Sequence, residues 1–150
     1  MDPDILSIVP MQVEDIPGVL VLEKGSLSAW HEKHLEDELK QATGFQFVAR
    51  HTFSEKLLAV LCGRIAADEG EILKLAVNRS VRQTGIGTQL LNYGLDYCRQ
   101  QGVKHCYLEL RAANVAARQL YEKCGFVEAG KRKRYYDLPE EDAILMRRQL

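Results

Sequence analysis

The stretch Arg82-Gln83-Thr84-Gly85-Ile86-Gly87 decides how this chain is interpreted, because it joins an apolar, strand-like segment to the start of a long amphipathic helix. The first backbone N–H groups of a helix have no partners within it and carry partial positive charge, so they can bind phosphate. Gly85 and Gly87 permit a conformation and a close approach that a Cβ would obstruct, and Arg82 adds a forked cationic donor. The stretch therefore predicts a loop that holds a pyrophosphate.

Two well-known nucleotide motifs are incomplete in this stretch. The Rossmann fingerprint requires a third glycine three residues after Gly87, where this chain has Leu90, and the Gly-Lys-Ser/Thr triplet of a P-loop is missing. A connection whose glycines merely ease the turn from strand to helix is the alternative. The choice between the two interpretations depends on the rest of the chain.

Length and charge limit the class of protein. The chain has 150 residues, 46% of them hydrophobic, which is enough for one buried core and too little for two ordinary domains, so residues 1–150 are expected to form one domain. Lys and Arg (20) nearly balance Asp and Glu (21), which gives no global attraction to nucleic acid or an anionic membrane. No apolar run approaches membrane-spanning length, and Met1-Asp2-Pro3-Asp4 lacks the features of a signal peptide. We expect a cytoplasmic protein with a small or local partner.

The cysteines and histidines do not form a metal-site pattern. His31 and His34 lie three residues apart, but no convincing third ligand accompanies them. The cysteines are widely spaced in apolar segments without a Cys-x-x-Cys pair, which predicts buried free thiols at Cys62, Cys98, Cys106 and Cys124. We therefore expect no metal.

The expected order of elements is strand, two helices, three strands, helix, strand, helix and two strands. Apolar alternation or continuous apolar runs predict strands at residues 5–9, 45–50, 57–67, 72–77, 105–111, 126–132 and 143–146. Helices are expected from about Glu14 to Lys24, after Trp30 to near Gly44, from Ile86 to Gly102, and from Asn114 to Gly125. Asp68-Glu69-Gly70 is expected to form a hairpin turn. This order predicts an α/β fold with a mixed sheet and helices on its faces.

Three polar residues, one in the 105–111 strand and two in the helix expected after it, are candidates for catalysis or cofactor binding. Glu109 lies in mid-strand between Leu108 and Leu110, where partial desolvation would improve its competence as a base; the alternative is an acid on the solvent face, paired with Arg111. Asn114 and Tyr121 are seven residues apart and are expected to share one helix face. Their alternatives are a helix N-cap and a core aromatic residue.

Four motifs together resemble a known family: Arg82-x-x-Gly85-x-Gly87; Leu108-Glu109-Leu110-Arg111-Ala112-Ala113-Asn114; Leu120-Tyr121-Glu122-x-x-Gly125-Phe126; and Tyr135-Tyr136 with Glu141-Asp142-Ala143. In these motifs the chain resembles the GNAT N-acetyltransferases, and within them the ribosomal-protein-alanine N-acetyltransferase (RimI) group. The resemblance is dense from about Leu75 to Met146 and thin before it. It implies a single-domain GNAT fold, whose central mixed, mostly antiparallel sheet is flanked by helices.

The resemblance also implies how acetyl-CoA binds as co-substrate. Its pyrophosphate would lie beside Arg82 on the backbone amides of six residues: Gln83, Thr84, Gly85, Ile86, Gly87 and Thr88. Its pantetheine would pair with the strand edge at Leu75, Ala76 and Val77. Asn114 matches a residue that contacts the cofactor.

For catalysis, the resemblance makes Glu109 the general base and Tyr121 the general acid that protonates the departing thiolate. Trp30, Tyr135 and Tyr136 are candidates to wall the acceptor pocket, although core packing explains Trp30 equally well. The family pattern has a proline before this tryptophan, where the chain has Ala29. The basic run Lys131-Arg132-Lys133-Arg134 is interpreted as a solvated segment beside a turn.

The expected reaction is direct acetyl transfer to an amine in a ternary complex. About a tenth of an α-amine of pKa near 8 is neutral at pH 7, whereas a lysine near 10.4 is almost wholly protonated. This favours a protein N-terminus over a lysine side chain, and the resemblance implies that the acceptor is an N-terminal alanine of a ribosomal protein. A lysine or small-molecule amine, and a non-catalytic acetyl-CoA-binding module, are the alternatives.

Overall fold

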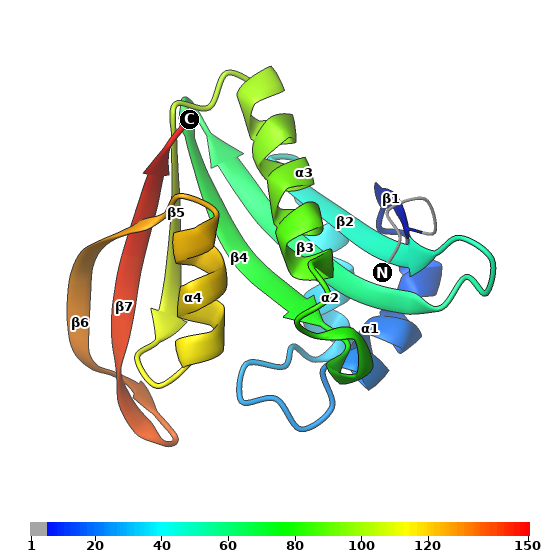
Figure 1. Ribbon diagram of the computed structural model, residues 1–150, viewed down its shortest axis with the longest axis horizontal. Coiled ribbons are helices and arrows are strands. Elements are labelled where there is room, and N and C mark those ends of the chain that lie inside the picture. The colour runs from blue at the N-terminus through cyan, green and yellow to red at the C-terminus, as the bar shows by residue number, and fades with distance from the viewer. Residues whose placement is uncertain (1–5) are drawn as a thin grey trace.

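Residues 6–150 are described by the computed structural model, and they contain one sheet of seven strands in the order β1-β2-β3-β4-β5-β7-β6 (Figure 1). Neighbouring strands are antiparallel except for β4 and β5, which are parallel. The expected mixed, mostly antiparallel sheet is therefore confirmed. The strands are β1 (Leu6–Pro10), β2 (Gly44–His51), β3 (Leu57–Ala66), β4 (Glu69–Val77), β5 (His105–Arg111), β6 (Val127–Asp137) and β7 (Glu140–Gln149).

Four α-helices cover the two faces of this sheet, with α3 and α4 on one face and α1 and α2 on the other (Figure 1). Two short 3-10 helices, η2 (Val13–Asp15) and η3 (Arg79–Val81), precede α1 and α3. The expected sequence of strands and helices is thus confirmed. The helices are α1 (Ile16–Leu22), α2 (Glu32–Leu39), α3 (Ile86–Gln100) and α4 (Val115–Lys123).

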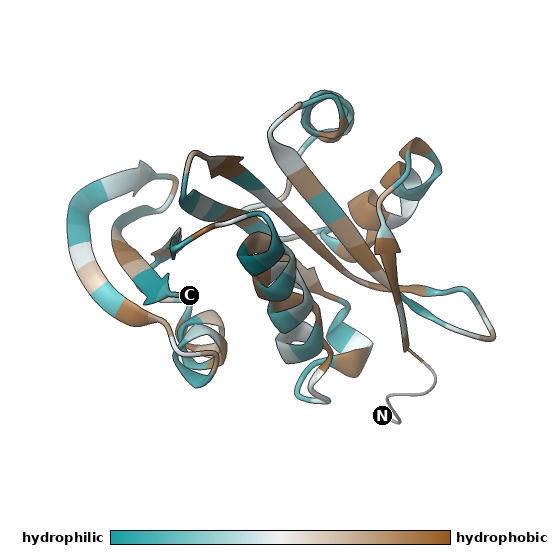
Figure 2. Cartoon of the chain, turned by 90° about the horizontal axis from the view of Figure 1, so that it is seen from above, coloured by the Kyte–Doolittle hydropathy of each residue, from teal (hydrophilic) through white to brown (hydrophobic). Residues whose placement is uncertain are grey.

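Two apolar cores lie between the helices and the sheet. The larger core joins α3 and α4 to the sheet through residues such as Phe45, Leu90 and Leu108, and the smaller one joins α1 and α2 through Val19 and Leu35. Strand β3 contributes to both cores, which explains its continuous apolar sequence. Figure 2 shows the outer strand β6 as largely hydrophilic, in line with its mostly exposed residues.

Strands β4 and β5 are paired only over their first halves. Glu69 to Ile72 pair with His105 to Leu108, after which β4 continues along β3 and β5 continues along β7, so the two strands separate (Figure 1). The register along β3 also shifts at Leu73, because Cys62 pairs with Lys74 while Gly63 pairs with Ile72. This bulge turns Lys74 toward the α1 and α2 side, whereas Leu75 packs on the larger core.

Some element boundaries differ from the expectation. Glu69 and Gly70 were expected in the hairpin turn but lie in β4, because Ala67, with φ of 53°, and Asp68 complete the turn before them. β6 and β7 are longer than expected, since their polar outer residues lack an apolar pattern. The first expected strand begins at Ile5, which lies outside the described residues, while β1 runs from Leu6 to Pro10. Helix α2 ends at Leu39, well before Gly44.

The four cysteines are all buried and free, as expected. Within residues 6–150, none of the helices combines the length and apolar character that crossing a membrane requires.

Candidate active site

The glycine loop between η3 and α3 presents backbone donors at a helix start. Gln83 and Gly85 have φ of 64° and 90°, and Gly85 is the N-cap of the 15-residue helix α3. Across residues 6–150, no acceptor is bonded to any backbone N–H from Gln83 to Thr88. A cluster of free N–H groups at a helix N-terminus suits the pyrophosphate of acetyl-CoA.

The two glycines of this loop serve different purposes. Gly85 has open space around the position of a Cβ, but its φ of 90° disfavours other residues. Gly87 is buried, and a Cβ there would lie 2.8 Å from Leu120 Cδ1 and 3.2 Å from Val77 Cγ2. At Gly87 the structure shows a close approach of α4 and β4 to α3, and the close approach of a ligand to either glycine stays a prediction.

A hydrogen bond from Arg82 joins the glycine loop to the end of β4. The Arg82 Nε donates a hydrogen bond of 3.2 Å to the carbonyl oxygen of Val77, and the Thr84 hydroxyl donates to the carbonyl of Val81. Arg82 is exposed, and its remaining guanidinium N–H groups have no acceptor in the described part of the chain. They can therefore bind a phosphate oxygen while Nε holds the loop.

The free edge of β4 is formed by alternate residues. Asn78 N donates to Leu58 O across the β3–β4 pair, and alternation along an antiparallel strand directs the backbone groups of Ala76 to β3 as well. The backbone groups of Leu75 and Val77 consequently face away from β3, on the side where β5 has separated. Of the three residues expected at this edge, Leu75 and the N–H of Val77 can pair with an extended ligand, while the Val77 carbonyl oxygen accepts from Arg82 Nε.

Glu109 lies on the face of β5 opposite the α3 core, because Leu108 and Leu110 occupy the core side. Its side chain is 25% exposed and forms an ion pair of 3.3 Å with Arg132 of β6. The expected alternative partner, Arg111, instead pairs with Glu141. An open groove of about 400 Å³ contains Glu109, and its walls include Arg64, Glu71, Tyr107, Arg132 and Leu145. The carboxylate is therefore accessible to an acceptor amine.

Tyr121 lies on the other side of the sheet, in the core beneath α4. It is 7% exposed and packs against Phe126 with ring centroids 5.8 Å apart. Burial, with smaller effects of Cys124 and Cys106, raises the pKa of the Tyr121 hydroxyl well above its ordinary value. The hydroxyl therefore carries its proton at neutral pH, as an unshifted tyrosine also does, and the raised pKa makes it a weaker acid.

Asn114 is the N-cap of α4, since its side-chain oxygen accepts a hydrogen bond of 3.2 Å from Ala117 N. Asn114 is exposed whereas Tyr121 is buried, so the seven-residue spacing does not give them a shared environment. The capping and core-packing alternatives are both confirmed. A contact of Asn114 with the cofactor stays a prediction.

The aromatic candidates come from two segments. Trp30, in the connection between α1 and α2, stacks on His34 with centroids 4.0 Å apart and packs on the smaller core. Tyr135 and Tyr136 belong to β6 and pack edge to face, with centroids 5.2 Å apart. Burial and then the neighbouring Glu109 carboxylate raise the pKa of Tyr136, so Tyr136 and Glu109 share one environment.

Two buried ion pairs, which were not predicted from the sequence, hold the segments that carry Trp30 and Tyr136. Lys74 and Glu23 form an ion pair with side-chain exposures of 4% and 3%, and Arg111 pairs with Glu141 at exposures of 13% and 14%. A lone lysine inside the apolar run of β4 was the available signal for the first pair. Arg132 is also more than a solvated residue of a basic run, because it contacts Glu109 and lies over the Tyr135 ring at 5.3 Å.

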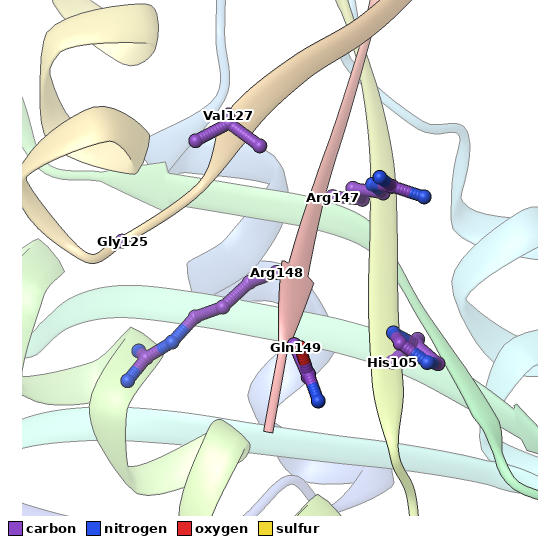
Figure 3. Close-up of a pocket in the computed structure, with 6 residues that line it drawn as sticks. All are labelled: His105, Gly125, Val127, Arg147, Arg148 and Gln149. Atoms are coloured by element: carbon purple, nitrogen blue, oxygen red, sulfur yellow. The ribbon is translucent and has the colours of Figure 1, made fainter.

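A second hollow, of about 220 Å³, lies beside the C-terminal end of β7 (Figure 3). It is lined by His105, Gly125, Val127, Arg147, Arg148 and Gln149, none of which is an expected site residue. Arg148 donates a hydrogen bond of 2.7 Å to the Cys124 carbonyl. This contact joins β7 to the end of α4.

Comparison with known proteins shows the family of this chain. Residues 16–126 match the model of the acetyltransferase (GNAT) family. The chain is 31% identical over 144 residues to the ribosomal protein bS18-alanine N-acetyltransferase of Escherichia coli (strain K12), covering 93% of this chain and 95% of that protein. It is also 31% identical over 140 residues to a putative enzyme of the same name from Bacillus subtilis (strain 168), and the match covers 91% of this chain and 90% of that protein. The crystal structure of the ribosomal-protein-S18-alanine N-acetyltransferase from Escherichia coli superposes with a TM-score of 0.86 at 29% identity, over 96% and 93% of the two chains.

Proposed function

The chain belongs to the acetyltransferase (GNAT) family and is an acetyl-CoA-dependent N-acetyltransferase, and from this premise we propose that it acetylates the N-terminal α-amine of a protein. The acceptor we propose is an N-terminal alanine of a ribosomal protein, as in the names of its relatives. The observation that carries the proposal is that Glu109 directly follows Leu108, the last residue of β5 paired with β4, and lies in an open groove on the face opposite the core that holds Tyr121.

Acetyl-CoA would bind along α3 and β4. The free amides from Gln83 to Thr88 and the guanidinium of Arg82 would hold its pyrophosphate, and the exposed Asn114 would lie near it. The outward backbone groups of Leu75 and the N–H of Val77 would pair with the amides of its pantetheine, which sets the thioester in the opening between the two strands.

Glu109 and Tyr121 would divide the proton transfers. Glu109 accepts a proton from the acceptor ammonium, directly or through a water, and the neutral amine forms a C–N bond to the thioester carbonyl carbon. An outward N–H of Leu75 or Val77 stabilises the charge that develops on the carbonyl oxygen. When the C–S bond breaks, the protonated Tyr121 hydroxyl gives its proton to the sulfur. The nitrogen loses its second proton to water, water returns a proton to the tyrosinate, and Glu109 releases its proton to solvent, so that one proton is released overall.

The acceptor would approach from the face opposite α3. Trp30 and Tyr136, from two separate segments, would form walls of its pocket, with the exposed Tyr135 at the rim. An α-amine suits a single carboxylate base better than a lysine does, because more of it is neutral at pH 7. We place the activity in the cytoplasm, and the near balance of charges supports no direct role for nucleic acid or membrane.

The test is CoA release from acetyl-CoA with three peptides: one with a free N-terminal alanine, the same peptide with that amine blocked and a lysine retained, and a blocked peptide without lysine. Release with the free α-amine alone is expected. Equal release with the lysine peptide would contradict the N-terminal assignment. If none of the peptides reacts, a polyamine and an amine antibiotic are tried next, and binding of acetyl-CoA without turnover would indicate a binding module.

A further inference from the structure

Two cations on neighbouring strands hold the two segments that carry Trp30 and Tyr136. The first is Lys74 of β4. Its Nζ pairs with the Glu23 carboxylate at the end of α1, donates a hydrogen bond of 2.8 Å to the Ser28 carbonyl oxygen, and lies 4.6 Å from the centroid of the Trp30 ring. Glu23 also accepts from the backbone N–H of Trp30. We call Lys74 and Glu23 the β4 clamp.

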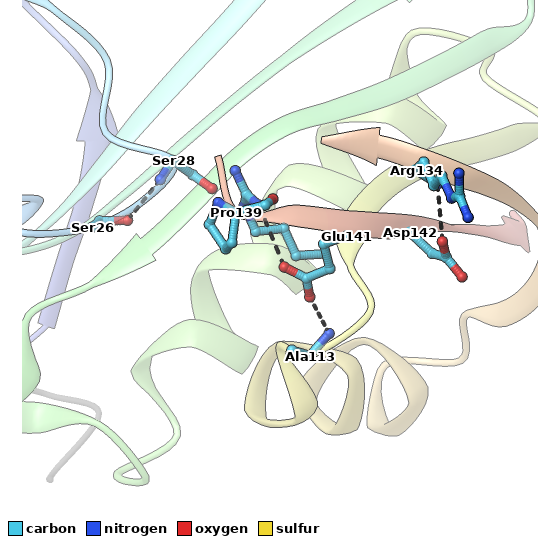
Figure 4. Close-up of polar contacts among 8 residues, drawn as sticks. Ser26, Ser28, Ala113, Arg134, Pro139, Glu141 and Asp142 are labelled. Carbon is cyan, nitrogen blue, oxygen red and sulfur yellow. Dashed lines mark hydrogen bonds and ion pairs between the residues drawn. The ribbon is translucent and has the colours of Figure 1, made fainter. Parts of the chain in front are cut away.

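The second cation is Arg111 at the end of β5. Its Nη1 donates to Glu141 and to the carbonyl oxygen of Pro139, each at 3.3 Å, and its guanidinium lies 4.1 Å from the centroid of the Tyr136 ring. Glu141 in turn accepts from the backbone N–H of Ala113, as Figure 4 shows. We call Arg111 and Glu141 the β5 clamp.

The two clamps have the same parts and corresponding positions. Each consists of a strand cation, a carboxylate, a loop carbonyl and an aromatic ring. Both cations lie just past Ile72 and Leu108, the last residues through which β4 and β5 are paired. They therefore flank the opening between the strands, one on each side.

Both clamped segments are exposed around the residues that the clamps hold. Residues 24–29 of the α1–α2 connection are exposed, and so are residues 137–140 at the turn between β6 and β7. The cations themselves are largely buried. A buried ion pair gains little stability over apolar packing, because desolvation offsets the attraction, but it can specify a particular arrangement.

We propose that Lys74 and Arg111 are positioning residues, which set the separation of the Trp30 and Tyr136 walls and so determine how well the acceptor binds. The inference rests on the proposed function in one respect, that these two aromatic residues wall the acceptor pocket. Within residues 6–150, no hydrogen bond or ion pair joins either clamp to the glycine loop, and the Lys74 side chain contacts the α1–α2 connection and not the free edge of β4. Loss of the side-chain contacts of a clamp is therefore expected to act mainly on the acceptor.

The test uses paired substitutions in the full chain, so that no buried charge is left alone. Lys74→Met with Glu23→Gln removes the β4 clamp, and Arg111→Gln with Glu141→Gln removes the β5 clamp while leaving an oxygen for Ala113 N. The expected result is a rise in acceptor KM of about 10- to 100-fold, the size of effect that a small misplacement has. The KM of acetyl-CoA is expected to stay unchanged. Arg111→Lys, which keeps the charge but loses the planar stacking, should fall between wild type and the double variant.

A matched control exists on β2. Arg50 pairs with the buried Asp15 and donates to the Glu55 carbonyl, so it has a similar carboxylate and carbonyl, but it lies far along the sheet from the opening. Arg50→Gln with Asp15→Asn should lower the Tm and leave acceptor KM unchanged. An equal rise in acceptor KM in this control, or an equal rise in the KM of both substrates in the clamp variants, would overturn the proposal.

A second readout does not depend on which acceptor is correct. Trp30 is the only tryptophan of the chain, so its fluorescence anisotropy reports the α1–α2 connection alone. Removing the β4 clamp should increase the local motion of Trp30, and the Arg50 control should not. Unchanged Trp30 motion in a folded β4-clamp variant would reject the positioning role, whereas inactivity of the wild type toward alanine peptides would reject only the acceptor.

Discussion

The guanidinium of Arg132 on β6 reaches across β7 to the carboxylate of Glu109 on β5, 3.3 Å away. The proposed base is thus held by a cation that is itself half exposed. An incoming ammonium would take the place of this cation at the carboxylate. Because exposed ion pairs contribute little, that exchange has a low energetic cost.

Glu109→Gln should remove the base without disturbing the cofactor site. We expect kcat to fall by about 10² to 10⁴, the usual contribution of general-base catalysis. Binding of acetyl-CoA, measured by calorimetry, should be unchanged. Glu128→Gln is the matched control, since Glu128 is an exposed acid that pairs with Arg118. A Glu109→Gln variant with wild-type kcat would exclude this residue as the base.

Tyr121→Phe should remove the acid while keeping the ring packed against Phe126. A loss in kcat of about 10² to 10⁴ is expected for a missing proton donor. Because burial raises the pKa of Tyr121, the wild-type rate should not fall as pH approaches 10, the ordinary value for tyrosine. Tyr97→Phe, at a tyrosine that packs on Phe45, should leave the rate intact. A Tyr121→Phe variant with wild-type kcat would contradict the role, whereas a decline of the wild-type rate that sets in well below pH 10 and is absent from Tyr121→Phe would contradict only the raised pKa.

Gly87→Ala should destabilise the fold through a clash with Leu120. Overpacking of this kind typically costs about 1–3 kcal/mol, measured by urea unfolding. Leu120→Ala makes room for the new Cβ. It should therefore lower the free energy of unfolding by less in the Gly87→Ala variant than in the wild type. Strictly additive costs would argue against the packing explanation.

Cys62 should make the fold sensitive to alkali. Burial raises the pKa of its thiol from 9.0 to about 12, so between these values the unfolded chain releases this proton and the folded chain keeps it. The free energy of unfolding should therefore fall as pH rises above 9, by about 1.4 kcal/mol per pH unit from this group. Comparing wild type with Cys62→Ala at pH 8 and pH 11 isolates the effect. If the free energy of unfolding falls equally in the two proteins between pH 8 and pH 11, the thiol does not contribute.

The order of strands and helices could be predicted from the sequence because each element carries its own local signal. Helix α3 has apolar residues at helical spacing after Gly85, and Asn114 has the chemistry of an N-cap. Boundaries were less predictable where that signal is weak. The hairpin of β6 and β7 extends through polar residues that only their cross-strand partners hold in strand conformation.

The candidate catalytic residues could likewise be found along the chain, since Glu109 and Tyr121 stand in recognisable motifs. The residues that contact them could not be predicted from the sequence. That Glu109 contacts Arg132 and not Arg111 depends on the strand order β5-β7-β6, which brings distant segments together. The reason Gly87 must lack a side chain depends on Leu120, which belongs to another helix.

By itself, the sequence determined the fold class, the family resemblance and the residue types available for acetyl transfer, because periodicity, caps and glycines are properties of short segments. Only the tertiary structure decided which of those residues meet. A single bulge at Leu73 turns Lys74 toward Glu23 and Trp30, and the early end of pairing between β4 and β5 leaves Leu75 and Val77 with outward backbone groups. Contacts of this kind come from packing between segments far apart in the chain, and no local pattern encodes them.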